Sequence, residues 1–350
     1  MPGAPMERPS PSLRWDLYCR VVDNFGDVGV CWRLATQLAA LGDTVRLVTD
    51  DPSALAWMAP PGARPAGVSV WPWPGPAGVA APIVVEAFGC ELPAATLEAM
   101  RRTDPVWINL EYLSAETYVE RSHGLPSPRS DGLRKWFFYP GFTPGTGGLL
   151  REPGLAARRA AFDRDAWLRV QGVPRREGER VATLFCYDNP ALDALRSALA
   201  DAPTLLLLTP GPAQRLVPQG TSLPGHLRTA ALPWLSQEDF DHLLWSSDLN
   251  AVRGEDSFVR GLWAGAAMLW QAYPQHDAAH KAKVEAAIGQ LALPSDVGAA
   301  WRAWNGMAPW RGLPALAGWQ PAIEAARDRL WRQDDLVTQL RHFAIQRLRG

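Results

Sequence analysis

Two short stretches of the sequence carry charged side chains in patterns that can do chemistry. The first contains Asp23 and Asp27, four residues apart, separated by Asn24, Phe25 and Gly26. Two carboxylates on a turn that glycine opens to close approach can orient a substrate and accept its proton. The same residues would also serve as a helix N-cap and as a favourable charge at the helix dipole, so the spacing leaves both interpretations open.

The second stretch contains Arg253, Glu255, Asp256 and Ser257. A helix that begins here would offer free backbone N–H groups, a serine hydroxyl and an arginine fork to phosphate oxygens. Two carboxylates repel a bare diphosphate unless they bind a hydroxyl group or a cation, and a sugar hydroxyl would satisfy Glu255. Helix capping by Asp256 or Ser257, with solvated neighbours, would explain the same residues.

Other motifs give weaker indications. The Asp-x-Asp sequences at 163–165 and 239–241 are formally metal-binding patterns, but their surroundings are helical and polar, so we expect no metal site. His276 and His280 have i,i+4 spacing without the glutamate of an HExxH motif. The sequence contains neither GxSxG nor GxxxxGK, which excludes the familiar hydrolase and P-loop routes.

Both charged stretches lie where a strand is expected to end and a helix to begin. A run of β-favouring residues at 15–22 precedes the first, and apolar residues at helical spacing follow it to residue 39. A predicted strand at 248–252 precedes the second, and a helix is expected from Ser257. Ligands of open α/β sheets bind beyond the carboxyl ends of strands, so both stretches are candidate ligand-binding loops.

The alternation of strands and helices occurs twice along the chain. It predicts two parallel sheets with right-handed crossovers, separated by a loop-rich stretch at 123–152. We therefore expect an α/β fold with two Rossmann-like domains that face each other across a cleft. The expected divisions are a disordered lead-in at 1–12, a first domain at 13–155, a second at 156–325 and a C-terminal helix at 326–350 that packs back on the first domain.

The composition limits the partners. Thirty-five lysines and arginines against 36 aspartates and glutamates give a net charge of −1, so we expect no nucleic-acid or membrane partner. No apolar run approaches the roughly 18 residues of a membrane span, and no signal-peptide core is present. Four scattered cysteines favour free thiols. These features together predict a cytoplasmic protein.

Several segments resemble one enzyme family. The sequences CRVVDNFGDVGVCWRL at 19–34 and DLNAVRGEDSFVR at 248–260 closely resemble the EarP family, the protein-arginine rhamnosyltransferases of bacterial elongation factor P. The shorter PGFT at 140–143, TGGLLRE at 146–152 and YPQ at 273–275 are also similar to that family. The resemblance runs in order over almost the whole chain.

The resemblance implies a GT-B fold and an inverting transfer of rhamnose from dTDP-β-L-rhamnose to one arginine of elongation factor P, without a metal or cofactor. By position, Asp27 resembles the general base, Asp23 its partner, and Glu255 the required carboxylate of the second domain. Asn24, Phe25 and Gly26 would form the acceptor-side loop. Because a guanidinium has a pKa above about 12, a carboxylate must take its proton as the new bond forms.

The resemblance also implies a donor site in the second domain. Its thymine pocket corresponds to Phe185, Tyr187, Gln237 and Phe240, with Trp234 where another aromatic residue tends to occur. Arg253, Ser257 and Tyr273 would contact the phosphates, and Asp256 is counted among the donor-binding residues. Stacking rings with an amide suit a pyrimidine, although ordinary core packing would also explain Phe185 and Phe240. The loops at 109–112 and 140–148 are candidates for acceptor recognition.

Two alternatives remain open from the sequence. One is a GT-B glycosyltransferase with another nucleotide sugar or acceptor, and the other is a non-catalytic protein that binds a nucleotide sugar. The presence of Asp23, Asp27 and Glu255 favours an enzyme.

Overall fold

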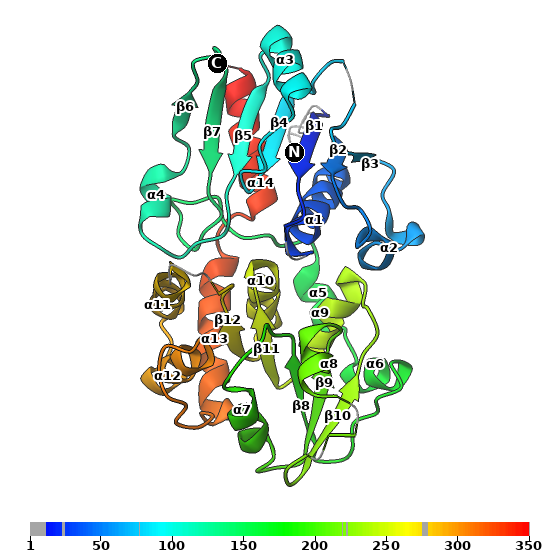
Figure 1. Ribbon diagram of the computed structural model, residues 1–350, viewed down its shortest axis with the longest axis vertical. Coiled ribbons are helices and arrows are strands. Elements are labelled where there is room, and N and C mark those ends of the chain that lie inside the picture. The colour runs from blue at the N-terminus through cyan, green and yellow to red at the C-terminus, as the bar shows by residue number, and fades with distance from the viewer. Residues whose placement is uncertain are drawn as a thin grey trace, which may run out of the picture.

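The computed structural model describes residues 12–22, 25–76, 78–218, 220–221, 223–274 and 279–349. The chain forms two α/β domains stacked along the long axis of the molecule, each built around its own sheet (Figure 1). Nearly all of the predicted lead-in, together with Asp23, Asn24 and His276, lies outside the described residues. The predicted α/β fold class is confirmed.

The first domain contains a sheet of seven strands in the order β3-β2-β1-β4-β5-β7-β6, parallel except for β6. Its strands are β1 (Arg14–Cys19), β2 (Thr44–Thr49), β3 (Val68–Pro72), β4 (Ile83–Ala87), β5 (Val106–Leu110), β6 (Pro126–Pro128) and β7 (Arg134–Phe138). Its helices are α1 (Gly26–Ala40), α2 (Leu55–Met58), the 3-10 turn η1 (Pro61–Ala63), α3 (Ala94–Thr103) and α4 (Tyr118–Ser122). The strand order reverses beside β1, which places the loop after β1 at the switch point where ligands bind.

The second domain contains a parallel sheet of five strands in the order β10-β9-β8-β11-β12. Its strands are β8 (Arg180–Leu184), β9 (Thr204–Leu208), β10 (Leu227–Ala231), β11 (Leu249–Arg253) and β12 (Ala267–Gln271). Its helices are α5 (Leu155–Ala160), α6 (Arg164–Val170), α7 (Leu192–Leu199), α8 (Pro212–Leu216), α9 (Gln237–Ser246), α10 (Glu255–Ala264), α11 (Ala279–Leu291), α12 (Ser295–Trp304) and α13 (Leu316–Trp331). The order reverses between β8 and β11, so the loop before α10 lies at the second switch point.

Two details differ from the expected elements. The stretch at 123–152, which was predicted to be rich in loops, also contains β6 and β7. The sequence pattern did not indicate β7, because this strand begins with the charged pair Arg134 and Lys135 and is mostly half-buried. The strand expected at 180–187 ends at Leu184, and Phe185 and Tyr187 follow it at the edge of the cleft. This early end frees Phe185 and Tyr187 to line a cavity.

The last helix returns to the first domain. Helix α13 packs on the second domain, and α14 (Leu336–Leu348) then packs against α1 and β5 of the first, as the red helix in Figure 1 shows. Leu336, Leu340 and Phe343 are buried in the first core. Helix α13 ends at Trp331, and α14 begins at Leu336 after a short connection.

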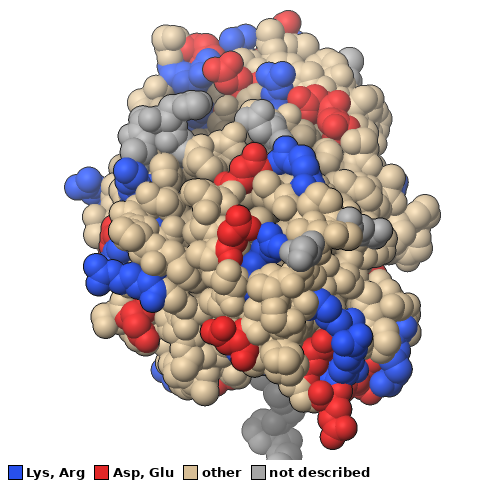
Figure 2. Space-filling view, turned by 60° about the horizontal axis from the view of Figure 1, so that its bottom comes forward, with Lys and Arg blue, Asp and Glu red and all other residues tan. Residues whose placement is uncertain are grey.

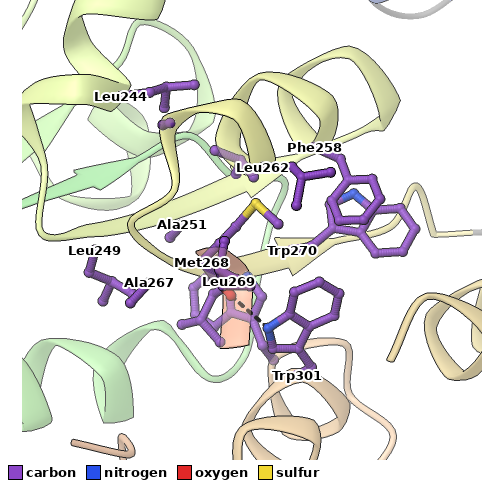
Figure 3. Packing of buried hydrophobic residues seen from close by; sticks show 14 of the residues in the cluster. Leu244, Leu249, Ala251, Phe258, Leu262, Ala267, Met268, Leu269, Trp270 and Trp301 are labelled. Atoms are coloured by element: carbon purple, nitrogen blue, oxygen red, sulfur yellow. Dashed lines mark hydrogen bonds between the residues drawn. The ribbon is translucent and has the colours of Figure 1, made fainter. Parts of the chain in front are cut away.

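The core of the second domain supports α10 from behind. Phe258 stacks on Trp270, with ring centroids 4.6 Å apart, and Trp301 donates a hydrogen bond from Nε1 to the Met268 carbonyl at 2.6 Å (Figure 3). Trp301 and Phe258 are almost fully buried. This packing fixes the helix whose first turn carries the second charged stretch.

The surface is mixed in charge. On the face in Figure 2, basic and acidic side chains are interspersed rather than gathered into one region of a single sign. None of the helices in the described ranges is both long and apolar enough to span a bilayer.

Candidate active site

Two adjoining cavities lie where the carboxyl ends of the two sheets face each other. The first, of about 320 Å³, is called here the Asp27 cavity and the second, of about 420 Å³, the aromatic cavity. Their shared lining residues are Gly26, Tyr187, Gly254, Glu255 and Asp256. Because Gly26 belongs to the first domain and Glu255 to the second, both cavities are formed by the two domains together.

Asp27 lies in the first turn of α1 and faces the Asp27 cavity. Its Oδ2 accepts a hydrogen bond from the Tyr112 hydroxyl at 3.2 Å, and the Tyr112 ring stacks on Phe88 with centroids 4.4 Å apart. Burial raises the pKa of Asp27 to about 6, against the lowering effect of that hydrogen bond. A carboxylate with a pKa near neutrality is suited to accept a proton.

Glu255 begins α10 and is held from both domains. Its Oε2 accepts a hydrogen bond from the Leu113 backbone N–H of the first domain at 3.0 Å, and its Oε1 lies 3.3 Å from Lys283 Nζ on α11. Burial raises the pKa of Glu255 to about 7, while Lys283 lowers it. Gly254 adopts a φ of 69°, and a Cβ there would lie 3.3 Å from the Tyr187 hydroxyl, so glycine permits this turn.

The aromatic cavity takes its inner wall from the second domain. Phe185 and Phe240 meet edge to face with centroids 5.5 Å apart, and both are only partly buried. The Arg253 guanidinium lies 4.6 Å from the centre of the Phe185 ring and 4.4 Å from that of Tyr187. Burial lowers the pKa of Arg253. The two phenylalanines thus contribute to a cavity wall as well as to packing.

The remaining predicted residues lie around the same two cavities. Ser257 is buried in the first turn of α10, and Trp234 is 52% exposed at the mouth of the aromatic cavity. Tyr273 follows β12 and lines the Asp27 cavity, where it meets Tyr187 edge to face. Gln237 Nε2 donates to the Gly29 carbonyl at 2.8 Å, so in this arrangement its amide links the domains.

A buried group of charges joins the domains behind the cavities. Arg33 on α1 contacts Glu152 at 3.0 Å and Asp241 at 3.2 Å, and Arg260 contacts the same carboxylates at 2.7 and 2.5 Å. Arg260 and Arg33 hold the pKa of Glu152 well below its usual range, although burial acts in the opposite direction. Asp256, with Oδ1 3.7 Å from Arg33 Nε, connects this interdomain ion network to both cavities.

The Asp-x-Asp sequences have structural partners. Asp163 caps α6 by accepting from the Ala166 N–H at 2.9 Å, and Asp165 pairs with Arg175 at 2.9 Å. In the second pair, Asp239 Oδ2 accepts a hydrogen bond from the Ser236 hydroxyl at 2.9 Å, and Asp241 belongs to the interdomain ion network. Within the described ranges, no group of three or more His, Cys, Asp or Glu side chains could hold a metal ion.

Every described residue of the predicted site lines one of the two cavities, whereas Asp23 and Asn24 are not described. Sequence reasoning did not single out Lys283 or Trp57, and it named Tyr112 only as part of a loop. Tyr112 lies two residues beyond β5, so the strand-end rule could have selected it. Lys283 lies within α11 and Trp57 on the short α2, where no motif marks them.

Two Rossmann-like domains whose facing strand ends enclose such a cleft form the GT-B fold. A calicheamicin glycosyltransferase, CalG4, shares this fold, with a TM-score of 0.54 and 13% identity over 96% of this chain and 99% of that one. The family model described as Elongation-Factor P (EF-P) rhamnosyltransferase EarP matches residues 15–345. The chain belongs to the EarP family, and it is therefore an enzyme, a glycosyltransferase.

Relatives of known name support this membership over nearly the whole length. The protein-arginine rhamnosyltransferase of Pseudomonas putida is 47% identical over 375 aligned positions, covering 94% of this chain and 98% of its own. That of Pseudomonas aeruginosa is 43% identical with the same coverage. A solved structure described as the structural basis for EarP-mediated arginine glycosylation of translation elongation factor EF-P has a TM-score of 0.67 and 34% identity, covering 96% of this chain and 99% of that one.

Proposed function

We propose that this enzyme transfers L-rhamnose from dTDP-β-L-rhamnose to the guanidinium of one arginine of elongation factor P, with inversion at the sugar carbon and without a metal or cofactor. The observation that carries the proposal is the pair Asp27 and Glu255. These two carboxylates line one cavity from opposite domains, and burial brings the pKa of each close to neutrality. The names of the relatives, protein-arginine rhamnosyltransferases, agree with an arginine acceptor.

The Asp27 cavity suits an arginine side chain. A protonated guanidinium is a poor nucleophile with a pKa above about 12, so it must be oriented and must lose a proton as the C–N bond forms. Asp27 is ionised above pH about 6 and is a stronger base than an ordinary aspartate, because its pKa is raised. Tyr112 orients its carboxylate through the hydrogen bond to Oδ2. Asp23 is the proposed partner of Asp27 in this step.

The aromatic cavity suits the nucleotide of the donor. Phe185 and Phe240 offer ring faces and edges to a thymine base, and Tyr187 extends that wall towards Glu255. At the start of α10, free N–H groups and the Ser257 hydroxyl can meet diphosphate oxygens. Arg253 adds a fixed positive charge to the same wall. These groups would stabilise the departing diphosphate without a metal.

The position of Glu255 supports the proposed inversion. Glu255 is shared by both cavities, and it would lie beside the sugar that joins them. The acceptor nitrogen would attack from the Asp27 cavity while the diphosphate leaves towards the aromatic cavity, on the opposite face of the sugar. A single in-line displacement of this kind inverts the anomeric carbon, and the two domains supply its alignment. Glu255 would hold a sugar hydroxyl.

The proposal is tested by intact-mass analysis of the organism's own elongation factor P after incubation with the enzyme, dTDP-β-L-rhamnose and EDTA. We expect one deoxyhexose on one arginine. Asp27→Asn should slow transfer by about 10²- to 10⁴-fold while dTDP still binds, and the exposed Asp193→Asn should behave as wild type. Full activity of Asp27→Asn would remove the base assignment. Binding of the donor without transfer would indicate another acceptor, and failure to bind it would exclude this donor.

A further inference from the structure

Three aromatic side chains from both domains meet at the mouth of the aromatic cavity. Trp57 on α2 of the first domain lies against Trp234 of the second, with ring centroids 4.6 Å apart and planes tilted by 33°. Phe25, at the N-cap of α1, contacts both indoles edge to face at 5.9 and 6.3 Å. All three rings line the aromatic cavity, and they are called here the interdomain aromatic cluster.

This cluster differs from the contacts that join the domains behind the cavities. The interdomain ion network is buried, with Arg33 and Arg260 almost inaccessible to solvent. In the cluster, Trp234 remains 52% exposed although it contacts two other rings. An aromatic contact between two domains that stays partly exposed to solvent can open and close at a modest cost in free energy.

We propose that Trp57, from the acceptor-side domain, is a residue that determines affinity for the donor nucleotide, because with Phe25 it closes the aromatic cavity against Trp234. The nucleobase would lie on the wall of Phe185 and Phe240, with the cluster as its outer cover. This inference rests on the proposed donor site and deepens it. It means that the nucleotide binds tightly only when the two domains are closed.

The position of Phe25 links this closure to the acceptor side. Phe25 caps the same helix that carries Asp27, two residues along the chain. When Phe25 packs on Trp57 and Trp234, the start of α1 is therefore held from the donor side. Gln237, which donates to the Gly29 carbonyl one turn further along α1, adds a second contact from the same side. Binding of the nucleotide would thus also hold the first turn of α1, which carries Asp27, in position for the acceptor.

The test compares nucleotide binding by calorimetry in wild type and in variants of Trp57. The probes are dTDP, UDP and GDP. Trp57→Ala should bind the preferred nucleotide roughly 3- to 10-fold more weakly, the loss expected from one aromatic contact, whereas Trp57→Phe should stay close to wild type. Trp71→Ala is the matched control, because Trp71 is a partly exposed indole of the same domain and lines neither cavity.

Hydrogen exchange of the unliganded proteins gives a second, ligand-independent measurement. Trp57→Ala should speed exchange at residues 232–237 of the opposite domain and leave both cores protected. If Trp57→Ala fails to fold, Trp57→Leu keeps apolar bulk and should still weaken binding. Unchanged or tighter nucleotide binding in a folded variant would overturn the inference, as would wild type that binds none of the three nucleotides. If wild type binds UDP or GDP but not dTDP, and Trp57→Ala weakens that binding, the role of the cluster would stand and only the proposed donor would be rejected.

Discussion

The hydroxyl of Tyr112 provides a direct test of Asp27 as the base. Tyr112→Phe removes the donor of the 3.2 Å hydrogen bond to Asp27 Oδ2 but keeps the ring that stacks on Phe88. That hydrogen bond favours the ionised carboxylate, so its loss should raise the pKa of Asp27 above its present value of about 6. The variant therefore needs a higher pH to reach the same ionised fraction.

The size of the shift follows from the geometry. Hydrogen bonds to charged acceptors contribute about 1.5–3 kcal/mol. This bond is long for O–H···O, and Tyr112 is 40% exposed, so we reduce that value for solvent screening. About 1 kcal/mol corresponds to roughly 0.7 pKa unit. Activity should then fall about threefold at pH ~6 and remain almost unchanged at pH ~8.5.

The assay is kcat/KM for arginine glycosylation as a function of pH. Its acid limb reports the coupled titration of Asp27 and Glu255, so the quantity to compare is the displacement of the limb rather than a single assigned value. Tyr139→Phe is the control, because Tyr139 belongs to the same domain and lines neither cavity. A loss of equal size at every pH, or an acid limb that stays in place, would refute the reasoning.

Substitutions at three further positions test the site and the packing that supports it. Lys283→Met should raise the pKa of Glu255 above about 7, because Lys283 lowers it now, so activity should fall at neutral pH and recover at higher pH. Lys283→Arg should keep the wild-type profile, and a Lys283→Met profile without a shift would contradict this role. Arg260→Met leaves Asp241 buried with less countercharge and should cost about 3–5 kcal/mol in denaturant unfolding; a loss below about 1 kcal/mol would show that the network is not needed for stability. Trp301→Ala should cost about 3–5 kcal/mol through the cavity it leaves, with Trp301→Phe losing less, and equal losses would point instead to the hydrogen bond from Nε1.

The central strands of both sheets were predictable because they are buried on both faces. The runs at 44–50 and 203–208 are almost continuous in β-branched or leucine residues, and each coincides with a strand in the structure. The strands β7 and β10 were not predictable in the same way. β7 opens with two charged residues and β10 contains Arg228, because a strand near a sheet edge faces solvent on part of its surface. The hydrophobic pattern of the sequence is therefore weakest in the strands that are least buried.

The same distinction holds in the site. Asp27 and Glu255 follow strands at the two switch points, so topology alone brought them to the cleft. Lys283 and Trp57 reach the cavities from helices whose position depends on how the domains pack. No spacing in the sequence relates Trp57 to Trp234, although their rings lie 4.6 Å apart. Contacts between domains are therefore the part of the site that local patterns do not contain.

The chemistry of the site also depends on that packing. Asp27 and Glu255 each lie in the first turn of a helix, a position that by itself favours the ionised form and an ordinary or lowered pKa. The pKa values of Asp27 and Glu255 are raised because burial in the cleft outweighs that effect. For Glu255, the first domain acts in both directions, because the nearby Asp27 charge raises the pKa whereas the hydrogen bond from the Leu113 N–H lowers it. A base suited to neutral pH thus requires both domains in contact, which is the state that the interdomain ion network and the interdomain aromatic cluster hold in place.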